Sequence, residues 1–198
     1  MKMAADYIVE HIEPNEEGLE LFLSKYKPFR LNALQTDPSF FGSNYAREVA
    51  QDDEFWYNRL RNPKTRTFLA LSPGRDVLSS ATMVIIPQIF PVFKKLLGIE
   101  DPPDDDTATL VQWVVNAVYT VGPARRKGIS SAILDKSVDY VMKDSASKGL
   151  SCLVVVNTLN GNRPALSMYE KAGFIRAPDE NGAEDHGEVM LYMWRPVK

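Results

Sequence analysis

The sequence predicts a single α/β domain built around a central mixed sheet. Three observations support this class. Strand-like and helix-like segments alternate along the chain without internal repeats. Between residues 109 and 156 a strand, a helix and a second strand follow one another as a β-α-β unit. With 198 residues and 44% hydrophobic side chains, the chain can bury one sizeable core. We therefore expect one domain over residues 1–198.

The first half of the chain contains five predicted elements. In chain order they are a strand at 7–12, a helical segment at 13–34, a loop and helix within 37–63, and strands at 67–71 and 77–86. Pro28 is expected to interrupt the first helical segment, because proline lacks a backbone N–H donor. In the second helix Phe55, Trp56 and Leu60 share one face, which predicts its buried side.

Residues 89–108 resemble an insertion between two strands. A short apolar piece is followed by a proline pair and three consecutive aspartates. An acidic tip of this composition is usually a solvated surface. The alternative is that its charge draws a cationic substrate toward a nearby site.

The clearest pattern lies in the β-α-β unit. Residues 109–121 are rich in β-branched side chains and apolar on both faces, as expected for a central strand. The short turn GPARRKG then leads into a helical pattern that continues to about Ser147. Gly149 is placed to end that helix, and residues 150–156 form the next strand.

Three consecutive cations, Arg125, Arg126 and Lys127, stand where this helix begins. The N-terminal end of a helix is already electropositive, so the cations form either a solvated turn or a site for an anion. Gly128 allows the backbone to approach a ligand, and Ser130 is small enough not to obstruct it. Neither a Walker A loop nor a GxGxxG fingerprint is present. The sequence thus predicts a phosphate site of a different type, Arg-x-x-Gly-x-Ser.

This arrangement resembles the acetyl-CoA-binding motif of the GNAT superfamily of N-acyltransferases, in which a strand and a turn precede Arg/Gln-x-x-Gly-x-Gly/Ala. Ser130 and the position of Pro123 depart from that pattern. A second block, NRPALSMYEKAGF, resembles the family signature Asn-x-x-Ala-x-x-x-Tyr-x-x-x-Gly-Phe. Its matching residues are Asn162, Ala165, Tyr169, Gly173 and Phe174. The resemblance covers a cofactor-binding core of about residues 109–195 and implies the GNAT fold, a mostly antiparallel twisted sheet flanked by helices.

The resemblance also implies acetyl-CoA as co-substrate and a set of site residues. Tyr169 is the implied catalytic acid, which protonates the departing thiolate. The implied cofactor contacts are Val118, Tyr119 and Thr120 on the strand, Arg125, Arg126, Lys127, Gly128, Ile129 and Ser130 in the loop, and Asn157, Asn162, Ala165 and Tyr169 downstream. Asn162 is equally suited to capping a helix, and both roles are compatible.

The general base is not evident from the sequence. A protonated amine must lose a proton before it attacks a thioester. The predicted central strand offers Gln112 and Asn116, neither of which is a base. The remaining candidates are Asp185, His186 and Glu188, acting through water.

The implied activity is transfer of an acetyl group to a primary amine, with a small molecule as the preferred acceptor. A protein acetyltransferase acting on lysines or N-termini is one alternative. A non-catalytic acyl-CoA sensor is another, because the strand carboxylate found in many family members is missing. A monomer or a homodimer is expected.

Composition also limits which binding partners, metal sites and cellular locations are expected. A net charge of -3 argues against a nucleic-acid or membrane-surface binder, because such binding needs broad basic patches. Cys152 is the only cysteine, so no internal disulfide and no multi-cysteine metal site is expected. The first residues lack a signal-peptide apolar core, and no run approaches the length of a membrane span. We expect a cytoplasmic protein without a metal.

Overall fold

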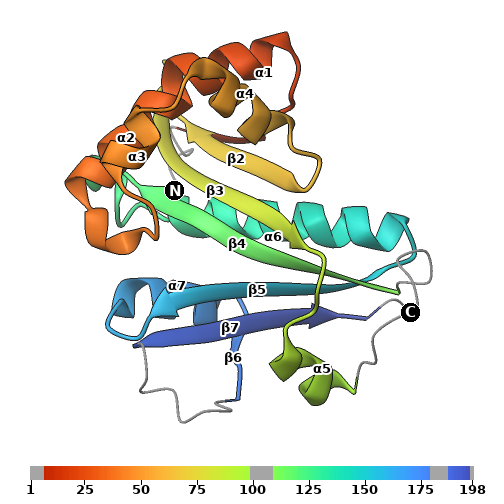
Figure 1. Ribbon diagram of the computed structural model, residues 1–198. Coiled ribbons are helices and arrows are strands. Elements are labelled where there is room, and N and C mark those ends of the chain that lie inside the picture. Colours follow the sequence, from red (N-terminus) through yellow and green to blue (C-terminus); the bar gives the residue numbers. More distant parts are fainter. Residues whose placement is uncertain (1–6, 99–108, 179–186, 197–198) are drawn as a thin grey trace, which may run out of the picture. The chain divides into compact units, whose positions relative to one another are not determined.

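The computed structural model describes residues 7–98, 109–178 and 187–196 (Figure 1). Its strands are β1 (Ile8–His11), β2 (Thr65–Leu71), β3 (Val77–Ile86), β4 (Leu110–Thr120), β5 (Ser151–Leu159), β6 (Ile175–Arg176) and β7 (Glu188–Arg195). They form a seven-stranded sheet in the order β1-β2-β3-β4-β5-β7-β6. β4 and β5 are parallel, whereas β1–β2, β5–β7 and β6–β7 are antiparallel. The predicted mixed sheet is confirmed.

The other described elements are helical segments. They are α1 (Glu16–Leu21), η1 (Phe22–Tyr26), α2 (Lys27–Thr36), η2 (Pro38–Phe40), α3 (Tyr45–Val49), α4 (Asp53–Arg61), α5 (Pro91–Leu97), η4 (Gly122–Ala124), α6 (Ile129–Ser147) and α7 (Arg163–Lys171). Asn15, Asn44 and Asp52 cap α1, α3 and α4 by accepting a hydrogen bond from a backbone N–H in the first turn. In the described part of the chain, none of these helices has the length and apolarity that a membrane span requires.

The predicted interruption at Pro28 was wrong. η1 is a π-helical turn that runs directly into α2, and Pro28 lies in the first turn of α2. Proline is tolerated there because its fixed φ suits a helix start. The helical path therefore passes through the proline, and the irregularity lies just before it.

Contacts within the chain divide it into two compact units. The first unit comprises residues up to Thr82 together with Ala117–Ile133, and the second comprises Met83–Asn116 and everything from Leu134 onward. Strands β3 and β4 and helix α6 contribute residues to both units. The single domain expected from the sequence stays a prediction.

The core of the first unit is strongly aromatic. Phe22, Tyr26, Phe29 and Trp56 are buried there together with aliphatic residues of β2. The rings of Phe22 and Tyr26 lie 4.4 Å apart, and Trp56 meets Tyr26 edge-on at 6.5 Å. Trp56 and Leu60 are buried as predicted. The prediction was wrong for Phe55, which is 39% exposed, because α4 buries only its i, i+4 pair deeply.

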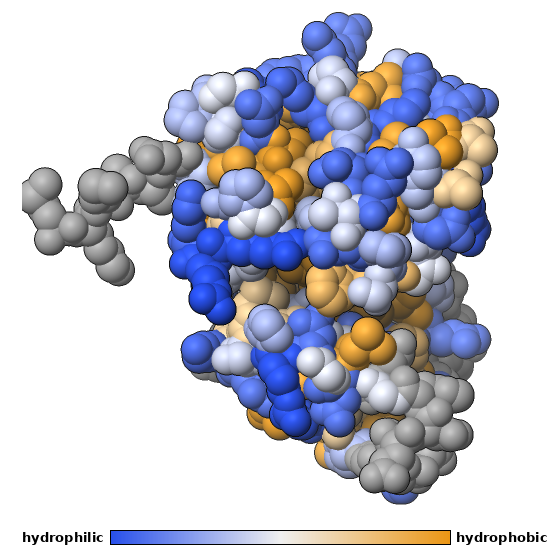
Figure 2. All heavy atoms as spheres, turned by 90° about the vertical axis from the view of Figure 1, so that its left-hand side faces the viewer, coloured by the Kyte–Doolittle hydropathy of each residue, from blue (hydrophilic) through white to orange (hydrophobic). Residues whose placement is uncertain are grey.

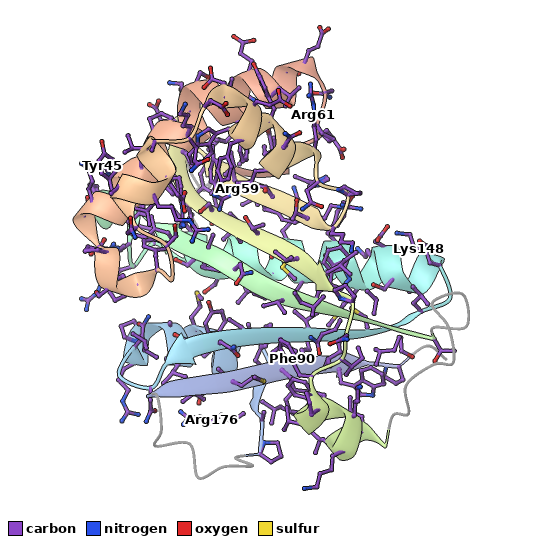
Figure 3. All side chains as sticks on the ribbon, in the orientation of Figure 1. Tyr45, Arg59, Arg61, Phe90, Lys148 and Arg176 are labelled. Atoms are coloured by element: carbon purple, nitrogen blue, oxygen red, sulfur yellow. The ribbon has the colours of Figure 1, made fainter. Side chains whose placement is uncertain are left out.

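A buried ion pair ties three helices of the first unit together. Glu48 of α3 accepts hydrogen bonds from Arg30 of α2 at 2.7 and 3.0 Å. Arg59 of α4, which is labelled in Figure 3, also donates to this carboxylate, at 3.2 Å. Burial alone would raise the pKa of Glu48, but the hydrogen bonds and charge of Arg30 outweigh it and hold the pKa below its usual value.

The second unit has an apolar core of its own. Phe93, Val114, Leu153 and Val155 are buried in it, and the Phe93 ring lies 5.2 Å from that of Tyr192. Because Phe93 belongs to α5, the first half of the predicted insertion is a helix that packs into this core. The predicted acidic tip falls within residues 99–108, outside the described residues.

Several individual residues complete the description of the second unit. Cys152 is buried in β5. Trp113 is also buried, and its indole N–H donates to the Ser145 hydroxyl at 3.3 Å, which makes it a core residue. Phe174 is buried, and β6, which follows it, is only two residues long. The face drawn in Figure 2 is mostly hydrophilic with scattered apolar patches.

Candidate functional site

The predicted phosphate loop connects β4 to α6 in the first unit. After β4 ends at Thr120, the 3₁₀ turn η4 leads into the exposed residues Arg125–Gly128. Arg126 has φ 62° and Gly128 has φ 78°, so the loop twice enters the left-handed region. Such turns direct successive backbone N–H groups to one side and create a concavity for an anion.

The start of α6 adds further donors to this loop. The first backbone N–H groups of a helix have no acceptor within the helix, and α6 begins at Ile129. A Cβ built on Gly128 meets no heavy atom within 4 Å. Open space therefore lies in front of Gly128, beside two exposed cations, Arg126 and Lys127. This part of the chain can hold an anionic group.

Arg125 behaves differently from its two neighbours. Its Nη2 donates to Asp37 at 2.6 Å, and its Nε donates to the carbonyl of Thr120 at 2.8 Å. The guanidinium also lies 5.4 Å from the centre of the Tyr119 ring. The Tyr119 hydroxyl donates to the same oxygen of Asp37 at 2.8 Å. The first cation of the loop is thus joined to the end of α2, a contact that sequence reasoning missed.

Hydroxyl groups join the end of β4 to the start of α6. The oxygens of Thr120 and Ser130 lie 2.7 Å apart, and those of Thr120 and Ser79 lie 2.8 Å apart. Ser79 also lies within hydrogen-bonding distance of the Tyr119 carbonyl, at 2.8 Å. Ser130, which departs from the family pattern, therefore uses its hydroxyl to fasten the loop.

Strand β4 contains a local distortion that sequence reasoning also missed. Ala117 has φ 53°, a left-handed conformation that is rare for alanine within a strand. Its carbonyl accepts a hydrogen bond from the Ser80 hydroxyl at 2.9 Å. Residues held in this region cluster at functional sites. No local signal could have found it, because alanine carries no turn preference.

The remaining predicted strand residues divide by burial. Tyr119 is buried, and its ring lies 5.7 Å from that of Phe29 and 5.6 Å from that of Phe41. Its side chain therefore belongs to the core of the first unit. Val118 is half-buried.

The other predicted residues lie in the second unit. Asn162 caps α7 by accepting a hydrogen bond from the Ala165 N–H at 3.3 Å, which confirms its capping role. Tyr169 is buried, with its ring 5.8 Å from that of Phe174. Burial raises the pKa of Tyr169, so its hydroxyl keeps its proton at neutral pH. Asn157 is exposed near the end of β5.

Comparison with known proteins identifies the family. The sequence model of a family described as "Acetyltransferase (GNAT) family" matches residues 30–174, which is more than half of the chain. The chain belongs to the GNAT acetyltransferase family. It is accordingly an acyltransferase. No curated protein matches this GNAT chain by sequence.

Solved structures share the GNAT fold at low sequence identity. Arabidopsis thaliana NAA60 in complex with acetyl-CoA is 14% identical, with a TM-score of 0.60 over 95% of this chain and 98% of that one. Spermidine N-acetyltransferase from Vibrio cholerae in complex with CoA and spermine is 10% identical, with a TM-score of 0.61 over 97% of each chain. Ribosomal-protein-S5-alanine acetyltransferase from Vibrio fischeri is 11% identical, with a TM-score of 0.61 over 97% of this chain and 94% of that one.

The structure brings the predicted residues of this GNAT protein together in two groups. The first-unit group consists of Val118, Tyr119, Thr120, Arg125, Arg126, Lys127, Gly128, Ile129 and Ser130. The second-unit group consists of Asn157, Asn162, Ala165 and Tyr169. The two sequence motifs thus correspond to two local structures, and a glycine with an unusual backbone conformation shapes each of them. Gly128 and Gly173, both with positive φ, shape the phosphate loop and the end of α7.

The candidates for the general base of this GNAT protein stay predictions. Gln112 is buried and accepts a hydrogen bond from the Phe90 N–H at 3.1 Å, whereas Asn116 is exposed. Asp185 and His186 lie outside the described residues, as does the side chain of Glu188. Among the residues that are described, no group of histidine, cysteine and acidic side chains is placed to hold a metal ion.

One groove lies in the second unit. It has a volume of about 810 Å³ and is lined along α6 by Leu134, Val138 and Met142, with Cys152 and Phe174 also contributing. None of the predicted site residues lines it. Burial raises the pKa of the Cys152 thiol, which makes it a poor nucleophile at neutral pH.

Proposed function

We propose that this GNAT protein transfers the acetyl group of acetyl-CoA directly to a primary amine of a small molecule. The observation that carries the proposal is the loop at the start of α6. There two left-handed residues, the first helical N–H groups and two exposed cations surround open space at Gly128. This combination suits a diphosphate, the most highly charged part of the cofactor.

The charge and the backbone donors of the loop suit the cofactor. Backbone N–H groups from Arg126 to Ser130 would bind the diphosphate oxygens, and the side chains of Arg126 and Lys127 would neutralise their charge. The backbone of Val118–Thr120 would run alongside the pantetheine arm. Ala117, next to this stretch, has a left-handed conformation, and its carbonyl accepts a hydrogen bond from the Ser80 hydroxyl.

The chemistry needs one bond made and one bond broken. The neutral amine nitrogen attacks the thioester carbonyl carbon, the carbon–sulfur bond breaks, and the sulfur leaves as a thiolate. In our proposal Tyr169 donates its hydroxyl proton to that sulfur, the nitrogen releases its extra proton to water, and the tyrosinate then takes up a proton from water. The buried hydroxyl of Tyr169 is protonated at neutral pH, as this role requires.

The acceptor class is the finer part of the proposal. Among proteins of similar fold, the Vibrio cholerae enzyme is a spermidine N-acetyltransferase, whereas the Vibrio fischeri enzyme is a ribosomal-protein-S5-alanine acetyltransferase. We propose a small amine for this chain, by analogy with the spermidine N-acetyltransferase of similar fold. A protein acceptor is the competing class.

Release of free CoA thiol from acetyl-CoA tests the proposal. The purified protein is incubated with acetyl-CoA and a panel of small primary amines, with N-terminal and lysine peptides as the second arm. We expect release that depends on a small amine. Preference for a peptide by specificity constant would overturn the acceptor class. Acetyl-CoA binding without amine-dependent release would support a non-catalytic sensor instead.

A further inference from the structure

The guanidinium of Arg125 is held on three sides within the first unit. Asp37 accepts from its Nη2 at 2.6 Å, the Thr120 carbonyl accepts from its Nε at 2.8 Å, and the Tyr119 ring lies 5.4 Å away. Asp37 is the residue at which α2 ends, 88 positions earlier in the chain. The side chain that begins the phosphate loop is therefore anchored to a distant helix.

The positive charge of Arg125 is also balanced by the negative charge of Asp37. The hydrogen bonds from Tyr119 and Arg125 lower the pKa of Asp37, so this carboxylate is ionised at neutral pH. An ionised carboxylate at 2.6 Å already neutralises the guanidinium, so a phosphate would have to compete with Asp37 for it. Arg126 and Lys127 are exposed and lie one and two residues further along the loop.

We propose that Asp37 is a positioning residue for cofactor binding, and that Arg125 fastens the phosphate loop without itself binding the diphosphate. This inference rests on the proposed function, since it concerns the same cofactor. Asp37 holds Arg125, Arg125 holds the Thr120 carbonyl, and Thr120 contacts Ser130 at 2.7 Å in the first turn of α6. The end of β4 and both ends of the loop are thereby fixed before any ligand arrives.

Fixing the loop matters because its donors are backbone groups. Arg125 is extended, with ψ 157°, and the next residue is left-handed, with φ 62°. The backbone conformation at Arg125 therefore sets the direction in which the following N–H groups point. A loop that is ordered in advance loses less conformational entropy on binding, so its affinity is higher.

The two roles for Arg125 predict opposite effects of Asp37→Asn. If Arg125 binds the diphosphate, removing its carboxylate partner frees the guanidinium and removes a negative charge, so CoA binds more tightly. If Arg125 fastens the loop, the same change loosens the loop and CoA binds more weakly. We expect the Kd for CoA and the KM for acetyl-CoA to rise roughly ten-fold, with kcat changed less than about two-fold. Unchanged or tighter binding would overturn the inference.

A pair of Arg125 variants gives a second, independent test. Lysine keeps the charge but cannot donate to both Asp37 and Thr120 in the geometry of a guanidinium. We expect Arg125→Lys and Arg125→Gln to weaken CoA binding to a similar extent. Near-normal binding by Arg125→Lys together with weak binding by Arg125→Gln would identify Arg125 as a charge that the diphosphate contacts, and would contradict the fastening role.

Three controls separate the inference from other failures. Asp76→Asn removes the same charge from an exposed ion pair with Lys25 in the same unit, and should leave CoA binding unchanged. The double variant Asp37→Asn, Arg125→Gln should bind CoA no more weakly than either single variant if both act as one fastener. Wild-type protein that fails to bind CoA in calorimetry would refute the proposed function, whereas wild-type binding with a normal Asp37→Asn variant would refute only the positioning role.

Discussion

The hydroxyl of Ser80 donates to the carbonyl of Ala117 at 2.9 Å, where β4 enters the left-handed region. Neighbouring Ser79 lies within hydrogen-bonding distance of the Tyr119 carbonyl. Adjacent side chains of a strand point to opposite faces of the sheet. The two consecutive serines of β3 therefore form hydrogen bonds with β4 carbonyls from opposite faces. The irregular part of the central strand is thus stabilised by side chains of its neighbour.

Replacing Ser80 by alanine tests this contact. Because Ser80 is buried, the change leaves the Ala117 carbonyl without that partner. We expect the free energy of unfolding in urea to fall by about 1–2 kcal/mol. Ser72→Ala on an exposed turn is the matched control and should change it by less than about 0.5 kcal/mol. Equal effects in the two variants would contradict the role of Ser80.

Substitutions of Ala117 should follow the left-handed preference. Valine is β-branched and tolerates positive φ poorly, so Ala117→Val should lower the free energy of unfolding by at least about 1–2 kcal/mol. Ala117→Gly should change it by less than about 1 kcal/mol, because relief of strain offsets the extra entropy of the unfolded chain. Thermal unfolding measures both. If the Ala117→Val variant were the more stable of the two and Ala117→Gly the less stable, as in a regular strand, the result would contradict the left-handed conformation.

Removing the Tyr169 hydroxyl should slow turnover more than it weakens cofactor binding. Tyr169→Phe keeps the ring beside Phe174 and deletes only the proton donor. We expect kcat to fall by about ten-fold or more and the KM for acetyl-CoA to change little. Tyr57→Phe, on α4 of the first unit, is the control and should keep normal turnover. Normal turnover by Tyr169→Phe would reject this residue as the acid.

A β-branched residue at Gly128 should weaken cofactor binding first. A Cβ there meets no neighbouring atom, so the cost of Gly128→Val lies in the backbone, which has φ 78°. The loop should relax away from this conformation and raise the KM for acetyl-CoA by about ten-fold or more. Gly42→Val is a matched control, because that glycine is equally open but lacks a positive φ. Unchanged affinity in Gly128→Val would mean that the diphosphate binds elsewhere.

Neutralising Glu48 should destabilise the protein, and the effect should depend on pH. Glu48→Gln leaves Arg30 buried without a counter-charge, at a cost of about 3–5 kcal/mol in the free energy of unfolding. The folded-state pKa of Glu48 lies below its usual value of 4.5. The wild-type advantage is therefore complete above pH 4.5 and shrinks as the pH falls through the folded-state pKa.

Urea unfolding of the wild type and Glu48→Gln between neutral and acid pH measures this difference. Asp53→Asn, which breaks the more exposed pair with Lys27, should cost less than about 1 kcal/mol. A destabilisation of Glu48→Gln that stays constant down to the lowest pH would show that the carboxylate charge is not its source.

Much of the fold could be predicted because its signals are local. The bounds of β3 agree with the predicted strand, and β4 and α6 lie within about a residue of theirs, since alternation and helical spacing are properties of contiguous residues. Prediction failed at Pro28 and Phe55. A proline in a first turn looks like a helix break from sequence alone, and the burial of Phe55 depends on what α4 packs against.

The sequence by itself determined the family, the predicted phosphate loop and the helix of the second motif, because each motif consists of neighbouring residues whose backbone preferences act within one turn. Only the tertiary structure decided which groups Arg125 contacts. Its partner Asp37 is 88 residues away, and Ser80 lies 37 residues from Ala117. No periodicity or spacing reports such pairs, since they form only when packing brings separate elements together. The first cation of the predicted phosphate site is thus already paired within the protein.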